Sequence, residues 1–327
     1  MTSRAVTHPQ LPEGIAFFER GWLSSNSVVL WDAEEINCVD TGYVAHAGQT
    51  LSLLQHAWPN RQVTRIINTH LHSDHCGGNA LLQEVFPGVE TLIPIGQYAD
   101  VVAWNESRLS YQSTGQRCPP FQVTQAIDNS TTLNLAGREW RSVSAPGHDP
   151  HAIMLWDSTE RILISADALW ENGFGIVFPE LNGVSAYADV ENTIKIIHDL
   201  DPLIVLPGHG ALITDVPAAM ERARTRLEKF RANPGTHTHH ALKALLKFWM
   251  LDRKQASWGQ LSAWVLEASL MRDALTFGLA QRWQVVEADA VGYWGAKSPE
   301  QEWLATALHQ LIKAGQLRAE DHIVFDA

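Results

Sequence analysis

The sequence predicts an α/β domain, with helices covering the faces of its sheets, followed by a smaller, mainly helical domain. Three observations support this prediction: short apolar β-branched runs recur in residues 1–216, helix-like segments lie between some of them, and long amphipathic stretches replace both after Pro217. The chain has 327 residues, of which 45% are hydrophobic. This length suits about two domains, for which we predict residues 1–216 and 217–327.

Seven runs in the first domain are typical of strands, because each is short, rich in β-branched residues and closed by turn residues. They cover residues 27–31, 36–40, 63–68, 90–95, 140–144, 161–166 and 202–207. Helix-like segments lie between some of these runs, at 46–57, 77–86 and 188–199. Sheets that alternate with helices need helical covers, so we expect an α/β architecture.

The second domain contains amphipathic stretches that predict helices at 217–232, 240–251, 258–277 and 299–314. Residues 308–327 run from a helix through a glycine turn into a short extended pair, a pattern typical of a winged-helix-like terminus. The favoured interpretation of this region is nevertheless a helical cap on the first domain. His237, His239 and His240 fall between two predicted helices, and we interpret them as a solvated loop.

The composition excludes several classes of protein. A net charge of −12, concentrated in the first domain, disfavours nucleic acid as a partner. No apolar run approaches the ~20 residues that cross a bilayer, and the first residues lack the apolar segment of a secretory leader. The three cysteines, Cys38, Cys76 and Cys118, are too few and too scattered for a disulfide framework. We therefore expect a cytoplasmic protein that acts on a small molecule and can form a homo-oligomer.

The strongest indication of chemistry is the segment THLHSDHCGG at residues 69–78. His70, His72, Asp74 and His75 fall there within six residues, directly after a predicted strand. Imidazoles and carboxylates suit zinc and similar divalent ions. A loop at the end of a rigid strand can aim several such groups at one point.

Three further polar residues also follow predicted strands: His148, Asp167 and His209. Strand ends are where α/β sheets place their sites, so we expect these side chains to join the first four. Seven ligands exceed what one tetrahedral ion takes, and the carboxylate of Asp167 can bridge. The sequence therefore predicts two divalent ions ~3.5–4 Å apart, zinc first, with iron or manganese as alternatives.

Over residues 15–216 the chain resembles the metallo-β-lactamase superfamily. The resemblance rests on the HxHxDH motif, followed by an isolated histidine, an isolated aspartate and a second PGH turn. The resemblance implies an αββα sandwich, and its closest branch contains glyoxalase II and lactonase-like hydrolases. It implies two ligand sets with a shared carboxylate: His70, His72 and His148; Asp74, His75 and His209; and the bridging Asp167. The DTG at 40–42 is similar to the first motif of the superfamily, which implies that Asp40 supports the ligands.

Departures from the better-known members narrow the activity. Zinc β-lactamases of the best-known subclass carry a cysteine where this chain has Asp167, which disfavours antibiotic hydrolysis. The glutathione-binding basic motif of glyoxalase II is not found in the C-terminal part. The interval between Asp167 and His209 is short and the domain is acidic, which disfavours a nuclease. Of the neighbouring residues, Cys76 is interpreted as a packing residue, and His151 is equally compatible with the pocket wall or a surface position. Aromatic side chains predicted to line a pocket are Trp104, Tyr111, Trp170, Phe174 and Phe178.

The sequence thus predicts a metal-dependent hydrolase of a small ester-like bond, a thioester or a lactone. The expected mechanism is attack by a metal-bridging hydroxide, with Asp167 as the bridge and Asp74 orienting the hydroxide or passing a proton to the leaving group. The chain has no GxSxG, GxGxxG or P-loop motif. Two alternatives stay open: a mononuclear iron dioxygenase of the persulfide type, and a nucleic-acid-binding metallonuclease.

Overall fold

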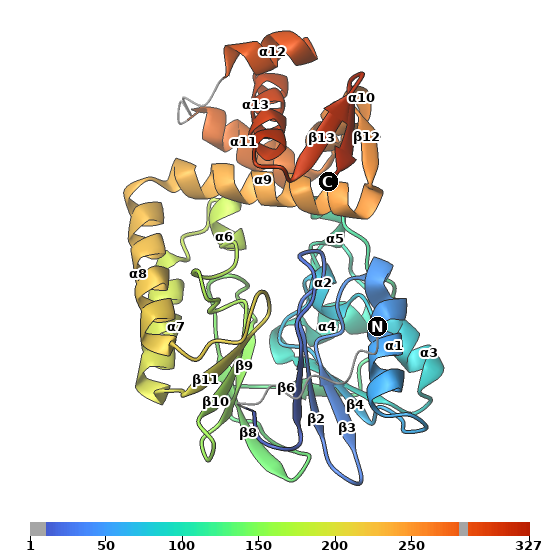
Figure 1. Ribbon diagram of the computed structural model, residues 1–327. Coiled ribbons are helices and arrows are strands. Elements are labelled where there is room, and N and C mark those ends of the chain that lie inside the picture. The colour runs from blue at the N-terminus through green and yellow to red at the C-terminus, as the bar shows by residue number, and fades with distance from the viewer. Residues whose placement is uncertain (1–10, 281–286) are drawn as a thin grey trace. The chain divides into compact units, whose positions relative to one another are not determined.

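The computed structural model describes residues 11–280 and 287–327 (Figure 1). The chain forms two compact units, one made by Met1–Tyr111, Arg117–Pro179 and Ser185–Glu228, the other by Gln112–Gln116, Glu180–Val184 and Lys229–Ala327. The helix α8 (Val216–Ala232) is continuous across this division. Separate folding of two domains divided after residue 216 stays a prediction. Within the described ranges no helix is both long and apolar enough to cross a membrane, and the expected lack of a leader concerns residues that lie outside them.

The first unit contains two sheets. The six strands of the first sheet pair in chain order: β1 (Ile15–Phe18), β2 (Ser27–Trp31), β3 (Ile36–Val39), β4 (Arg65–Ile67), β5 (Glu90–Pro94) and β6 (Gln125–Ile127). The pairs β1–β2 and β2–β3 are antiparallel, and the pairs from β3 to β6 are parallel. The ends of β3 and β4 therefore meet at one edge of this sheet.

The second sheet has the order β11-β10-β9-β8-β7. Its strands are β7 (Thr132–Leu135), β8 (Arg138–Ser144), β9 (Ile153–Asp157), β10 (Ile162–Ala166) and β11 (Ile204–Pro207). Both β8 and β10 run antiparallel to β9, and β11 runs parallel to β10. The carboxyl ends of β8, β10 and β11 consequently lie at the same edge, where the residues that follow them can meet.

The core between the sheets is apolar and takes residues from both. Leu30, Ile67 and Leu92 of the first sheet belong to the same buried cluster as Trp140 and Ile164 of the second. A second cluster fills the other face of the first sheet, against α1 (Ala47–Ala57) and α3 (Asn79–Val85). The helix α7 (Tyr187–Leu200) lies on the outer side of the second sheet (Figure 1). The predicted αββα sandwich is confirmed.

Residues 44–181 also contain short helices: α2 (Ser73–Cys76), α4 (Tyr98–Val102), α5 (Tyr111–Thr114) and α6 (Phe178–Leu181), with 3-10 turns η1 (Val44–His46) and η2 (Ile95–Gln97). The seven predicted strands and three predicted helices are all present, with ends shifted by up to two residues. Four strands, β1, β6, β7 and β9, were not predicted.

The second unit combines helices with a small sheet. Its helices are α9 (Pro234–Arg253), α10 (Trp258–Glu267), α11 (Ser269–Ala280), α12 (Ala288–Trp294) and α13 (Pro299–Lys313), and its strands are β12 (Gln255–Ser257), β13 (Leu317–Glu320) and β14 (Ile323–Asp326). The strands form an antiparallel sheet in the order β12-β14-β13. A helix followed by a hairpin that pairs with an earlier strand is the pattern that the alternative, winged-helix-like interpretation implied.

Two expectations for this region are wrong. The helix predicted at 258–277 is interrupted at Ala268, whose backbone is extended (φ −67°, ψ 106°), so α10 and α11 are separate. The histidines of THTHH lie in α9 and not in a loop, and His237 is buried. Pro234 occupies the first turn of α9, a position that suits proline because its missing N–H would have no partner there.

Candidate metal centre

The structure brings the predicted ligand residues together at the carboxyl ends of the strands. The segment after β4 carries four of them, and single residues follow β8, β10 and β11: His70, His72, Asp74, His75, His148, Asp167 and His209. Their ligand atoms form three overlapping groups, each with its atoms within 4.8 Å of one another. The strand ends thus deliver side chains that are up to 139 positions apart in the chain (209 − 70) to one place.

The first group consists of three buried imidazoles. His72 Nδ1 lies 2.8 Å from His148 Nε2, which lies 3.2 Å from His70 Nε2. Ligand nitrogens bound to one tetrahedral zinc are about 3.3 Å apart, because zinc–nitrogen bonds are about 2.0–2.1 Å long. The spacing and the chemistry of this group therefore fit a divalent ion.

The second group combines His75, His209 and Asp74. Asp74 Oδ2 lies 3.1 Å from His209 Nε2 and 3.9 Å from His75 Nε2. His75 Nε2 is buried and satisfies no hydrogen bond among the residues the structure describes. A buried nitrogen that faces two carboxylates without bonding to either suits a cation between them, so this group also fits a divalent ion.

Asp167 lies between the two groups. Its Oδ2 is 3.3 Å from His148 Nε2, and its Oδ1 is 3.4 Å from His75 Nε2. Each oxygen of the carboxylate therefore faces a different group. Trp170 Nε1 donates a hydrogen bond to Oδ1 at 3.1 Å. The backbone of Gly208 approaches so closely that a Cβ there would lie 2.3 Å from Oδ1, which explains why glycine precedes His209.

Groups behind the imidazoles fix their orientation. Asp40 Oδ2 lies 2.8 Å from His75 Nδ1, and Asp40 also accepts from the N–H and the hydroxyl of Thr69. The Nδ1 atom of His148 lies 2.6 Å from the carbonyl oxygen of Ile176 and donates to it. An imidazole that donates from one nitrogen presents the lone pair of the other to a metal. Asp40 thus lies where the resemblance implied it would.

One supporting carboxylate was missed. Asp149 is buried, and its Oδ2 lies 3.8 Å from His72 Nε2, on the far side of that ring from the other imidazoles. The backbone N–H of His151 donates to Asp149 Oδ1 at 2.6 Å and holds the carboxylate in place. The available signal was its position directly after His148 in GHD, but nothing in the sequence places it against His72, which lies 77 positions earlier (149 − 72).

Burial decides the charge of the first group. It lowers the pKa of His72 and of His148 to about 4. Burial also lowers the pKa of His70 well below its usual value, with a further contribution from the neighbouring imidazoles. All three rings are therefore neutral at pH 7, the form in which imidazole binds metals.

The carboxylates of Asp74 and Asp167 remain ionised. Burial alone would raise the pKa of Asp167, but His75 and His209 lower it well below its usual value. The same two imidazoles lower the pKa of Asp74 against the effect of burial. Burial alone would lower the pKa of His75, but the surrounding carboxylates, first Asp167, raise it well above its usual value. The second group therefore concentrates negative charge around one imidazole, which favours a cation.

Two of the five predicted pocket aromatics lie at the centre. The ring of Phe178 lies 4.5 Å from that of His72, and the ring of Trp170 lies 5.1 Å from that of His209. The expectation for Trp104 and Tyr111 is wrong, because they pack with each other and with other apolar residues in a separate buried cluster. Phe174 is fully buried and lines a small cavity together with His148 and Asp167, and the cation of Arg226 lies over its ring.

The structure also places two neighbours of the ligand residues. Cys76 is buried in the same separate cluster, as its interpretation as a packing residue implied. His151 is exposed, and its ring lies against Gly96, where a Cβ would come within 2.2 Å of His151 Nδ1.

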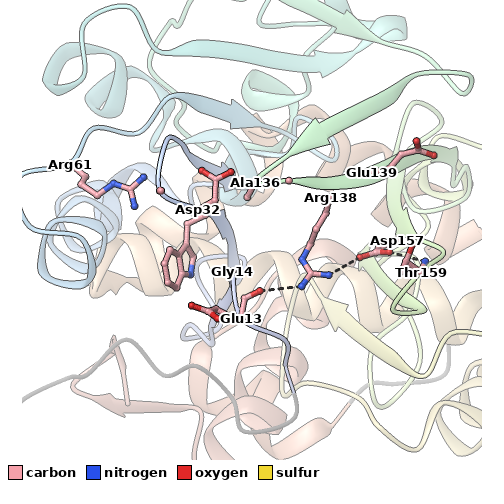
Figure 2. A pocket seen from close by; sticks show the side chains of 12 residues that line it. Glu13, Gly14, Asp32, Arg61, Ala136, Arg138, Glu139, Asp157 and Thr159 are labelled. Carbon is pink, nitrogen blue, oxygen red and sulfur yellow. Dashed lines mark hydrogen bonds and ion pairs between the residues drawn. The ribbon is translucent and has the colours of Figure 1, made fainter.

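A groove of about 800 Å³ lies at the opposite end of β8 from His148 (Figure 2). Arg138, at the start of β8, is paired there with Asp157 at 3.4 Å and donates to the carbonyl oxygen of Glu13 at 3.1 Å. Asp157 also accepts from the backbone N–H of Thr159. Figure 2 shows that Arg138 and Asp157 are paired in this groove, and none of the predicted ligand residues lines it.

An αββα sandwich whose strand ends gather histidines and aspartates into two metal-competent groups defines a class of metalloprotein. A family model for the metallo-beta-lactamase superfamily matches residues 20–209, and the chain belongs to this superfamily. The family predicted from the sequence is thereby confirmed.

Curated relatives match about three fifths of the chain. The chain is 24% identical over 205 residues to an atrochrysone carboxyl ACP thioesterase of Aspergillus chevalieri, covering 61% of this chain and 56% of that protein. It is 29% identical over 195 residues to a beta-lactamase-like protein 2 homolog of Caenorhabditis elegans, covering 59% and 58%. It is 26% identical over 228 residues to the acyl-coenzyme A thioesterase MBLAC2 of Homo sapiens, covering 62% and 80%. The match thus spans little more than half the length of the first two relatives.

Solved structures share the fold over almost the whole chain. A metallo-beta-lactamase family protein from Thermus thermophilus has a TM-score of 0.55 and 20% identity, covering 97% of this chain and 99% of that one. A beta-lactamase domain protein from Burkholderia ambifaria has a TM-score of 0.56 and 17% identity, covering 97% and 93%. The region after the sandwich is therefore part of the shared fold.

Proposed function

We propose that the protein is a hydrolase that uses two divalent metal ions, zinc first, to cleave the thioester or lactone bond of a small acyl compound. The observation that carries this proposal is the placement of Asp167. Its two oxygens face two different ligand groups, at 3.3 Å from His148 Nε2 and 3.4 Å from His75 Nε2. A carboxylate in this position suits two ions better than one.

The two ions would supply a water of lowered pKa and polarisation of the substrate carbonyl. The residues of the chain have separate tasks around them. His70, His72 and His148 would hold the first ion, Asp74, His75 and His209 the second, and Asp167 would join them. Asp74 is ionised and partly accessible, so it can accept a proton from water at one oxygen while the other faces His209.

The surroundings favour an acyl substrate over a phosphate. Phe178 and Trp170 place aromatic rings beside the two ligand groups, and both are half-buried. Rings of this kind contact apolar acyl chains well. Two of the relatives described above are named thioesterases, which supports a thioester as the first substrate to test.

The alternatives have less support. A mononuclear iron dioxygenase would leave the second group unused, yet Asp74, His75 and His209 are as well assembled as the first group. A nuclease that read nucleic acid through the second unit would need an exposed helix face for the groove. In α13, the helix before the hairpin, residues 301–312 are all buried or half-buried.

Metal content and a substrate panel test the proposal together. Metal ions are counted in the protein purified without added metal. The protein is then loaded with zinc and assayed on acyl-coenzyme A thioesters, lactones and phosphodiesters. We expect two ions per chain and hydrolysis of a thioester or lactone. One iron per chain with oxygen consumption on a persulfide, or turnover confined to phosphodiesters, would refute it.

A further inference from the structure

We propose that Asn26 is a positioning residue that fixes His209 relative to Asp74 and thereby sets the geometry of the second ligand group. The inference rests on the proposed function, because it gives that group a metal ion to hold. Asn26 immediately precedes β2 in the first sheet, whereas His209 follows β11 in the second. The contact therefore joins the two sheets at the end where the ligands lie.

Asn26 bonds to three carbonyl oxygens in the turn that carries His209. Its side-chain Nδ2 donates to the oxygens of Pro207 at 2.9 Å and of Gly210 at 2.8 Å. Its backbone N–H donates to the oxygen of Gly208 at 2.6 Å. Asn26 is 3% exposed, so water does not compete for these bonds. The turn is consequently held on both sides of His209 by one residue.

The bonding pattern requires a carboxamide. Nδ2 supplies two hydrogens to two carbonyl oxygens, and Oδ1 accepts from the backbone N–H of Arg20 at 2.8 Å. Asparagine alone among side chains of this size offers two donors and an acceptor in a fixed fork. Aspartate has the same shape but would direct an oxygen at two carbonyl oxygens. Asn26→Asp therefore reverses the contact while conserving the volume.

The preceding residue holds the other partner in the group. The backbone N–H of Ser25 donates to the carbonyl oxygen of Asp74 at 2.9 Å. Consecutive residues, Ser25 and Asn26, thus bind the backbone of Asp74 and the turn of His209. The two side chains meet with His209 Nε2 at 3.1 Å from Asp74 Oδ2. This short segment determines where the two ligands lie relative to each other.

The first ligand group does not depend on this contact. Within the described residues, the hydrogen bonds of Asn26 go to Arg20 or to the turn at 207–210. His148 is held instead by the carbonyl oxygen of Ile176. Loss of the Asn26 contact should therefore weaken one ion and spare the other, which a general loss of stability would not do.

The experiment is a cobalt titration of the metal-free full-length protein, followed by visible absorption. Two binding steps are assigned with His72→Ala, which removes a ligand of the first group, and His209→Ala, which removes one of the second. Asn26→Asp is then compared with the wild type. Asn37→Asp is the matched control, because Asn37 is a buried asparagine of β3 whose Nδ2 donates to the oxygen of Leu30, away from the ligands.

We expect Asn26→Asp to weaken the step that His209→Ala abolishes by about 10- to 100-fold, the effect typical of residues behind metal ligands. The other step, and both steps in Asn37→Asp, should stay within about twofold of the wild type. Asn26→Ser keeps one donor and is the milder variant if Asn26→Asp does not fold. In Asn26→Ser, the binding step that His209→Ala abolishes should weaken less than it does in Asn26→Asp.

Wild-type affinity for both ions in Asn26→Asp, or equal weakening of both steps, would overturn the inference while leaving the two-ion function intact. Failure of both Asn26 variants to fold would assign the residue to the fold and would also overturn it. A wild-type protein that binds a single cobalt ion would instead refute the proposed two-ion function, and the inference with it.

Discussion

Replacing Trp170 with phenylalanine separates the two contacts that this side chain makes at the candidate metal centre. The indole ring lies against His209, with ring centroids 5.1 Å apart, and Nε1 donates to Asp167 Oδ1 at 3.1 Å. Phenylalanine keeps an aromatic ring beside His209 and removes only the donor. We therefore expect Trp170→Phe to fold normally and to leave the carboxylate of Asp167 less firmly oriented.

The size of the effect follows from the charge and burial of the acceptor. A hydrogen bond to a charged group contributes about 1.5–3 kcal/mol. Asp167 is 5% exposed, so water replaces little of the lost bond, but Trp170 is only half-buried. We take the lower end, about 1.5 kcal/mol, which corresponds to about a tenfold change in rate. The loss should appear in kcat and leave KM nearly unchanged, because orienting Asp167 affects the reaction and not the binding of the acyl chain.

The assay is steady-state hydrolysis of the best thioester by the zinc-loaded protein. Trp31→Phe is the control, since Trp31 is also half-buried and its indole N–H has no hydrogen-bond partner within residues 11–280 and 287–327. We expect the control to keep its kcat within about twofold. If Trp170→Phe and Trp31→Phe both keep wild-type kcat, the hydrogen bond does not orient Asp167. If the two lose activity equally, the loss reflects packing alone.

Four other outcomes are expected. Asp167→Asn should keep the fold but lose most activity, and two bound metals with near-normal turnover would contradict the bridging role. His72→Ala should lose most of the affinity for the first ion, whereas His209→Ala should retain at least one ion per chain and still be inactive, as measured by metal analysis and hydrolysis rates. Full activity of His209→Ala at one metal per chain would favour the mononuclear alternative. Burial raises the pKa of Cys38 to about 12, so its thiol should stay protonated at pH 8 and resist iodoacetamide until urea unfolds the protein, measured by mass spectrometry. Limited proteolysis near Asn233 should release no soluble fragment that binds duplex DNA.

The ligand residues could be predicted because each lies in the segment that follows an apolar strand. The pattern of β10, in which ILISA is buried throughout and Asp167 comes next, is visible in the sequence. The strand β9 (IMLWD) is equally buried but was not predicted, and it begins only two residues after His151, close to the loop that carries His148. Short strands beside a functional loop lack the turn residues that would separate the two.

Polar residues that act through contacts across the fold could not be predicted. Asn26 lies 181 positions from Pro207, to which it donates, and its local sequence, SSNS, resembles an ordinary turn. The histidines of α9 were misplaced for a related reason, since a polar composition and an NPG sequence suggested a loop. His237 is buried by tertiary packing, which local pattern does not record.

Backbone strain lies where the two ligand groups meet. Asp40 (φ 56°) and Ala166 (φ 46°) adopt the left-handed conformation although neither is glycine, at a cost of order 1–3 kcal/mol each. Asp40 directly follows β3 and supports His75, and Ala166 directly precedes Asp167 at a register shift between β10 and β11. His75 and Asp167 face each other across the boundary between the groups. The bonds of Asp40 to Thr69 and His75 offset part of the strain, so the protein itself, before any ion binds, holds the two groups at a fixed separation.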